Sequence, residues 1–210
     1  MKHVFHSRLI LSLAVAAFAA AACSKRTDNA IDTTTASGSV ALPDTTPSPP
    51  ALPTTDGGIV EVLKTADSGE VAAAELARTK AKNAEVKSFA RLMITDHGND
   101  LKHISQMRVV DSAAAAMPEM SPLVTDMKSK HDAAMMDLNG LSGAEFDRVY
   151  MDKMVAGHQE VLGLLRQLQT RAQSADLQTH LTAVVGVVEK HLERAREVQS
   201  KLASDTTRTG

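Results

Sequence analysis

The chain has 210 residues, and its 23 basic and 25 acidic side chains give a formal net charge of −2. Aromatic residues make up only 2% and Trp is absent, so Ala, Leu, Val and Met must fill the core. Such a composition suits packed helices and argues against a β-sandwich. No basic stripe with interleaved aromatic residues occurs, so we expect no nucleic-acid partner.

The N-terminal residues have the pattern of a secretory signal peptide. Lys2 and Arg8 precede an apolar run over residues 9–22, which ends in small residues. This run is shorter than the roughly 20 residues that span a bilayer. The sequence therefore predicts a signal peptide over residues 1–22 and an exported protein.

Cys23 is the only cysteine of the chain and directly follows four alanines. The segment resembles the lipobox of bacterial lipoproteins, in which the cysteine is acylated and becomes the mature N-terminus, although Ala20 stands where Leu is usual. The resemblance implies a membrane anchor through a lipid on Cys23. Ser24, in place of Asp, implies the outer membrane. The alternative is plain secretion with an incidental Cys23.

A composition change separates a tether from a folded domain. Residues 24–57 are rich in Thr, Ser, Pro, Ala and Asp and contain few large apolar side chains. Because such a stretch buries little apolar surface, we expect a disordered tether over 23–57, counted from the lipidated cysteine. The folded domain is predicted over residues 58–205.

Apolar residues recur at helical spacing throughout this domain, and no strand-like pattern competes. Asn83 is a suitable N-cap, and Pro122 is suited to a first helical turn. The pattern predicts helices over roughly 58–81, 84–110, 122–139, 144–172 and 175–203.

The helix lengths indicate an all-α fold with two long hairpins, the first two helices forming one and the last two the other. The shorter third helix is long enough to travel back along the bundle. We therefore predict a ferritin-like four-helix bundle with a short extra helix in the crossover. A plain up-and-down arrangement of five helices is the alternative.

Four polar residues interrupt the apolar stripes of the four long helices: Glu70, His97, His158 and His191. Each lies three or four residues from apolar neighbours on its own stripe, so each should face inward. Counting from the hairpin turns at about 1.5 Å per residue places all four near the middle of the bundle. The sequence thus predicts one central polar layer.

Buried carboxylate and imidazole groups cost free energy unless they find partners. One interpretation is a structural layer in which the four side chains hydrogen-bond to one another. The other is a metal site, since one Glu and three His suit Zn, Fe, Mn or Cu. Asp67 and Asp100 lie one helical turn from Glu70 and His97 and are expected to support these side chains or to act as extra ligands.

Several segments resemble a known family. They are Gly69-Glu70-Val-Ala, the run from Ala84 to Asp-His97, the run from Phe146 to Gly-His158, and Glu189-Lys-His191-Leu-Glu. Together they are similar to a bacterial family of exported ferritin-like proteins, a domain of unknown function often labelled as outer membrane proteins. The resemblance covers roughly residues 58–202 and implies the fold and an envelope location. It implies no activity.

The residues argue against a di-iron carboxylate site, which uses a Glu on two helices and Glu-x-x-His on two others. Ile94 and Val188 stand three positions before His97 and His191. Our first interpretation is therefore a non-enzymatic envelope lipoprotein with a polar layer. The alternatives are a metal-binding redox or metal-handling envelope protein, and a helical binding module for an envelope partner. The sequence indicates no particular protein partner.

Overall fold

The structure is a computed structural model and describes residues 50–107 and 121–209, with side chains described as far as residue 204. These residues belong to one compact unit, Pro47–Gly210. The predicted signal peptide, Cys23 and the predicted tether as far as residue 49 lie outside the described residues.

The described residues form five helices and no strand, which confirms the all-α prediction. The helices are α1 (Asp56–Lys80), α2 (Ala84–Gln106), α3 (Pro122–Gly140), α4 (Gly143–Gln169) and α5 (Ala175–Thr209). None of these helices combines the length and the apolarity that a membrane span requires.

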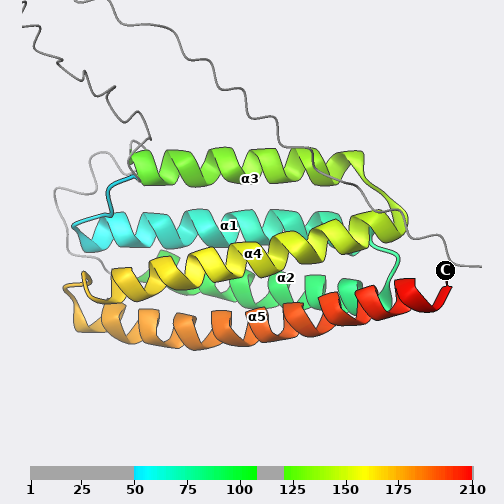
Figure 1. Ribbon diagram of the computed structural model, residues 1–210. Helices are drawn as coiled ribbons and strands as arrows, with labels where there is room; N and C mark the ends of the chain where they lie inside the picture. The colour runs from blue at the N-terminus through cyan, green and yellow to red at the C-terminus, as the bar shows by residue number, and fades with distance from the viewer. Residues whose placement is uncertain (1–49, 108–120, 210) are drawn as a thin grey trace, which may run out of the picture. The chain divides into compact units, whose positions relative to one another are not determined.

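The four long helices pack as two antiparallel hairpins, α1 with α2 and α4 with α5 (Figure 1). The hairpins join through α1 against α4 and α2 against α5. Helix α3 lies along the outside of α1 and also touches α4. Because α3 carries the chain from the end of α2 back along the bundle to the start of α4, α2 and α4 point in the same direction. This is the crossover arrangement that we predicted for a ferritin-like bundle, rather than an up-and-down array.

Local sequence signals set the helix ends. The Thr55 side chain accepts a hydrogen bond from the Gly58 amide at 3.1 Å, and the Asn83 side chain accepts one from Glu85 at 2.8 Å. Gly143 turns the chain between α3 and α4 with φ of 63°, a conformation that favours glycine. Leu52 packs against the core, so the chain joins the bundle ahead of α1.

A layer of polar side chains divides the apolar core into two halves. One half contains Ile59, Leu63 and Leu181, and the other contains Phe89 and Phe146. Along α1, α2 and α4 the predicted polar position lies between the two halves, and on α5 the change follows directly after His191 and Leu192. The polar layer therefore crosses the middle of the bundle, as the apolar stripes predicted.

Each hairpin turn is held by an aspartate from the other hairpin. Asp56 at the start of α1 accepts hydrogen bonds from the Gln173 and Ser174 amides at 2.7 and 2.8 Å. Asp147 near the start of α4 accepts bonds from the amides of residues 82 and 83, the shortest at 2.7 Å. The number of residues from Asp56 to Asp147 equals the number from the amides in the first hairpin turn to those in the second. Each hairpin therefore makes the same contact with the other.

The Asp56 contact predicts a specific acid sensitivity. Burial raises the pKa of Asp56, but the amide hydrogen bonds from Gln173 and Ser174 outweigh it and hold the pKa below its ordinary value. Because the folded pKa is the lower one, the stabilisation is complete above the unfolded value of about 3.9 and is lost as the pH falls through the folded value.

We therefore expect Asp56→Asn to be less stable than the wild type at pH 6, with a gap that narrows as the pH falls below about 4. Urea unfolding across this range measures the gap. Asp137→Asn, which alters an exposed ion pair with Lys153, serves as control and should cost less than about 1 kcal/mol. A gap of constant size down to pH 2 would contradict the role given to the Asp56 charge.

Candidate metal centre

Three histidines from three helices meet in the polar layer: His97 of α2, His158 of α4 and His191 of α5. Their side chains are almost fully buried, and each offers one ring nitrogen such that all three nitrogens lie within 4.8 Å of one another. The ring centroids are 5.2 to 6.1 Å apart. We call these residues the three-histidine centre.

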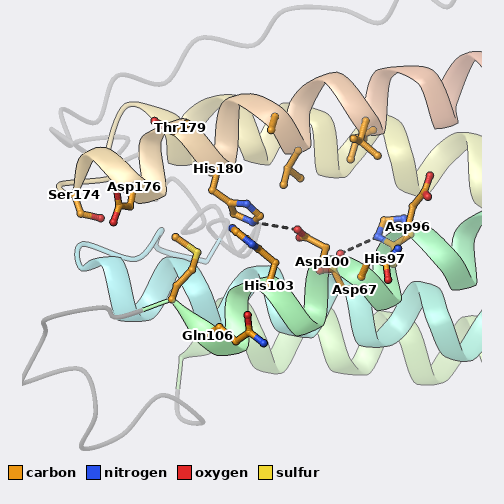
Figure 2. A pocket seen from close by; sticks show the side chains of 16 residues that line it. Asp67, Asp96, His97, Asp100, His103, Gln106, Ser174, Asp176, Thr179 and His180 are labelled. Carbon is orange, nitrogen blue, oxygen red and sulfur yellow. Dashed lines mark hydrogen bonds and ion pairs between the residues drawn. The ribbon is translucent and has the colours of Figure 1, made fainter.

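The other nitrogen of each ring makes a hydrogen bond that fixes the ring. His97 Nδ1 lies 2.8 Å from Asp67 Oδ1, a contact drawn in Figure 2. His191 Nε2 lies 2.8 Å from an Asp96 carboxylate oxygen. His158 Nδ1 lies 2.9 Å from the main-chain oxygen of Met154, one turn earlier on α4. Carboxylate and carbonyl partners of this kind are typical behind metal-bound histidines.

These hydrogen bonds determine which nitrogen is free. A carbonyl or ionised carboxylate oxygen can only accept, so the bonded nitrogen carries the proton and, in a neutral ring, the opposite nitrogen carries a lone pair. The free atoms are His97 Nε2, His158 Nε2 and His191 Nδ1, and each is buried without a hydrogen-bond partner among the described residues. When all three rings are neutral, these atoms are three buried acceptors without partners, which is costly unless a cation joins them.

Burial favours the neutral form of two of the three rings. It lowers the pKa of His158, and it lowers the pKa of His191 to about 4. Burial also lowers the pKa of His97, but the Asp67 hydrogen bond and the Glu70 charge outweigh it and raise the value overall. Burial raises the pKa of Asp67 to about 6, and neighbouring Asp100 adds to the rise. Neutral imidazoles are the form that binds a metal ion.

Glu70 lies beside the three-histidine centre. Its Oε1 is 4.0 Å from His158 Nδ1, the nitrogen already bonded to Met154, and it is not one of the ligand atoms that lie within 4.8 Å of one another. Its Oε2 is buried without a partner among the described residues. The structure therefore brings Glu70 close enough to add negative charge, but it places only the three histidines as a converging ligand set.

The two predicted supporting aspartates occupy different positions. Asp67 bonds directly to His97. Asp100 lies beside Asp67 but turns toward His180 of α5, with an oxygen 3.3 Å from His180 Nε2 (Figure 2). Asp100 thus belongs to a second group of polar residues, next to the centre and away from the three free nitrogens.

Sequence reasoning missed two residues of the site. Asp96, which orients His191, lies off the apolar stripe of α2 and resembles a surface charge in the sequence. Tyr150, whose buried hydroxyl has no hydrogen-bond partner in the described part of the chain, lies two helical turns before His158 on the same face. Burial and the nearby Glu70 charge raise the pKa of Tyr150 well above its ordinary value. The four-residue spacing from Tyr150 to Met154 to His158 could have shown that Tyr150 faces the same side of α4 as His158.

Aromatic side chains close one side of the centre. The Phe89 ring contacts the rings of both His158 and Tyr150, with centroids 6.3 and 6.4 Å apart, and Phe146 stacks on Tyr150 at 6.0 Å. A groove of about 1000 Å³ between α2 and α5 approaches the other side, and His97 is among its lining residues. The centre is therefore bordered by aromatic rings on one side and by this groove on the other, with its free nitrogens buried.

The sequence matches the family described as "Domain of unknown function (DUF4142)" over residues 41–198. The chain belongs to this family. No curated protein and no solved structure matches it. Family membership adds no activity, so the chemistry of the DUF4142 domain has to be argued from the residues of its polar layer.

The residues of this DUF4142 domain fit a transition-metal ion. Three imidazole nitrogens around a tetrahedral ion with bonds of about 2.0–2.1 Å lie about 3.3 Å apart, so the three rings need only a small inward movement. Three histidines leave a fourth position open. Imidazole donors without a thiolate suit Zn, Fe, Mn or Cu and do not distinguish strongly among them.

Proposed function

We propose that this protein binds a divalent transition-metal ion in the bacterial envelope, with His97, His158 and His191 as ligands. Asp67, Asp96 and the Met154 carbonyl hold the three rings in the binding orientation. Two observations support the proposal: one ring nitrogen from each histidine lies within 4.8 Å of the other two, and each ring has a buried nitrogen without a hydrogen-bond partner in the described residues. The proposed class of function is metal handling.

The alternative of a purely structural polar layer requires the four polar groups to satisfy one another. The described histidines do not hydrogen-bond to one another. Each bonds to an aspartate or to the main chain and leaves its second nitrogen without a partner in the described residues. A hydrogen-bonded layer leaves fewer buried groups unsatisfied. The geometry therefore favours the metal site over the structural layer.

The binding-module alternative depends on a groove beside α3. A groove of about 520 Å³ lies between α1, α3 and α4, but its lining includes Asp126, Lys130 and Glu160 as well as apolar residues. Lys130 of α3 bonds to Glu160 of α4 at 2.7 Å, so an ion pair ties the two walls together. These contacts hold α3 on the bundle and give no specific support to a protein-binding role.

The metal proposal is tested on untagged protein, because a histidine tag would bind the same ions. We expect elemental analysis of the purified protein to show bound Zn, Fe, Mn or Cu. After removal by a chelator, adding the ion back should raise the melting temperature. Identical melting curves with chelator and with each of the four ions would refute the proposal.

We also propose that a lipid on Cys23 anchors the chain in the outer membrane, on the basis of the signal-peptide pattern alone. Replacing Cys23 by Ser should release the processed protein from membranes into the soluble periplasmic fraction. Cell fractionation with immunoblotting measures the distribution, and mass spectrometry should find a diacylglycerol group on the wild-type cysteine. Full membrane retention of the processed Ser variant would show that something other than the lipid holds the chain.

A further inference from the structure

The groove between α2 and α5 contains further Asp and His side chains that are not among the three histidines of the centre. Its acidic lining residues are Asp67, Asp96, Asp100 and Asp176, and neither Lys nor Arg lines it in the described part of the chain. His103 and His180 line the same groove. A concave surface with only negative charges concentrates cations from solution.

Asp100, His103 and His180 come together in this groove. Asp100 and His103 lie three residues apart on α2, so both project toward the same side of the helix. His180 faces them from α5, with its ring centroid 4.8 Å from that of His103 and its Nε2 3.3 Å from Asp100 Oδ1. Figure 2 shows the two rings side by side and the Asp100 carboxylate directed toward His180.

Two of these residues carry buried polar atoms without a hydrogen-bond partner. The His180 side chain is only 7% exposed. Its Nε2 lies at ion-pair distance from Asp100 Oδ1 without an aligned hydrogen bond, and the Asp100 Oδ2 is buried next to the Asp67 carboxylate. His103 is exposed, so its ring is free to turn toward the other two. A cation placed between the three side chains would interact with all of them.

We propose that Asp100, His103 and His180 bind a second divalent transition-metal ion in the groove. Two imidazoles and one carboxylate are a common ligand set for such ions and leave further positions for water. Because one ligand is exposed and must be ordered on binding, this groove site should be the weaker of the two.

The position of the groove site suggests its role, which rests on the metal-binding function proposed above. Asp100 lies beside Asp67, and Asp67 holds His97 of the three-histidine centre. His97 lines the same groove, so an ion held by the groove ligands is already close to the three-histidine centre. The groove site loads the three-histidine centre, and removing it should slow loading more than it changes the final occupancy of that centre.

The test is a titration of untagged, metal-free protein with Co²⁺, followed by visible absorbance and by counting bound ions. The wild type should bind two ions per chain in two steps. His103→Ala and His180→Ala should each lose the weaker step and retain the tighter one. Because His103 is exposed, its variant avoids the folding risk of replacing buried His180. His131→Ala, a histidine of α3 outside both groups, should retain both steps.

Further variants separate this proposal from the three-histidine proposal. His191→Ala should retain the weaker, groove-dependent ion and lose the tighter one. Stopped-flow mixing should show loading of the tighter site slowed about tenfold or more in His103→Ala. One ion per chain in the wild type, unaffected by His103→Ala, would overturn the groove site and leave the three-histidine centre standing. Two ions in the wild type with unchanged loading in His103→Ala would overturn the loading role.

Discussion

Replacing His158 by alanine is expected to abolish the stabilisation that the tighter-binding metal ion gives to the wild-type protein. An ion that binds only the folded state adds about 2.7 kcal/mol to the free energy of unfolding at a hundredfold excess over its dissociation constant. His158 supplies one of three converging nitrogens, and the remaining two are a poor site for the same ion. His97→Ala and His191→Ala should lose the same gain.

Urea unfolding of each variant, with the ion and with a chelator, measures this gain. The cavity left by the substitution lowers the stability equally with the ion and with the chelator, so it cancels in the difference between the two curves of one variant. The free ion is kept at a concentration that fills only the tighter step. His131→Ala is the matched control and should keep the full gain. A gain of wild-type size in all three centre variants would eliminate the three-histidine centre.

Glu70→Gln distinguishes a ligand from a neighbouring charge. If the carboxylate bound the ion directly, its replacement would weaken binding as much as loss of a histidine. The structure places Glu70 against the bonded nitrogen of His158 at 4.0 Å, outside the converging set. We therefore expect only a partial loss of the metal-dependent gain in this variant.

Helical periodicity was enough to identify the inward positions of the centre. His97, His158 and His191 lie on the apolar stripes of their own helices, and the stripe of one helix depends only on that helix. The turns fix the height of each position, because the rise per residue is constant. The predicted all-α crossover bundle followed from the same information.

The contacts around the centre needed knowledge of which helices are neighbours. Asp96 lies off the stripe of α2 and reaches His191 only because α2 packs against α5. Glu70 lies on its stripe, yet the packing of α1 against α4 brings it to the far nitrogen of His158. A single sequence gives the period of each helix but not the rotation of one helix relative to the next.

The helix ends show the same limit. In the sequence Asp56 falls within the predicted tether, and Asp147 looks like an ordinary acidic residue near a helix start. Their amide partners lie in the turn of the opposite hairpin, remote along the chain. Only the assembled bundle shows that these two charges join one hairpin to the other.

Asp147→Ala is therefore expected to be among the most destabilising single substitutions outside the apolar core. The Asp147 side chain is buried and accepts hydrogen bonds from the Lys82 and Asn83 amides. Hydrogen bonds to a charged acceptor contribute about 1.5–3 kcal/mol each, and both amides would lose their partner. We expect the free energy of unfolding to fall by about 3 kcal/mol, measured by urea unfolding.

Asp152→Ala is the matched control, since Asp152 lies on the same helix, makes a largely exposed ion pair with Arg148 at 3.3 Å and accepts one hydrogen bond from the neutral Gln199 side chain at 2.8 Å. Such surface pairs contribute about 0–1 kcal/mol, so the control should lose far less. Asp147→Asn, which keeps one accepting oxygen, should fall between the two. Because Asp147 lies outside both ligand groups, Asp147→Ala should still gain stability from the metal ion. Equal losses in Asp147→Ala and Asp152→Ala would show that the buried carboxylate does not hold the α1–α2 turn.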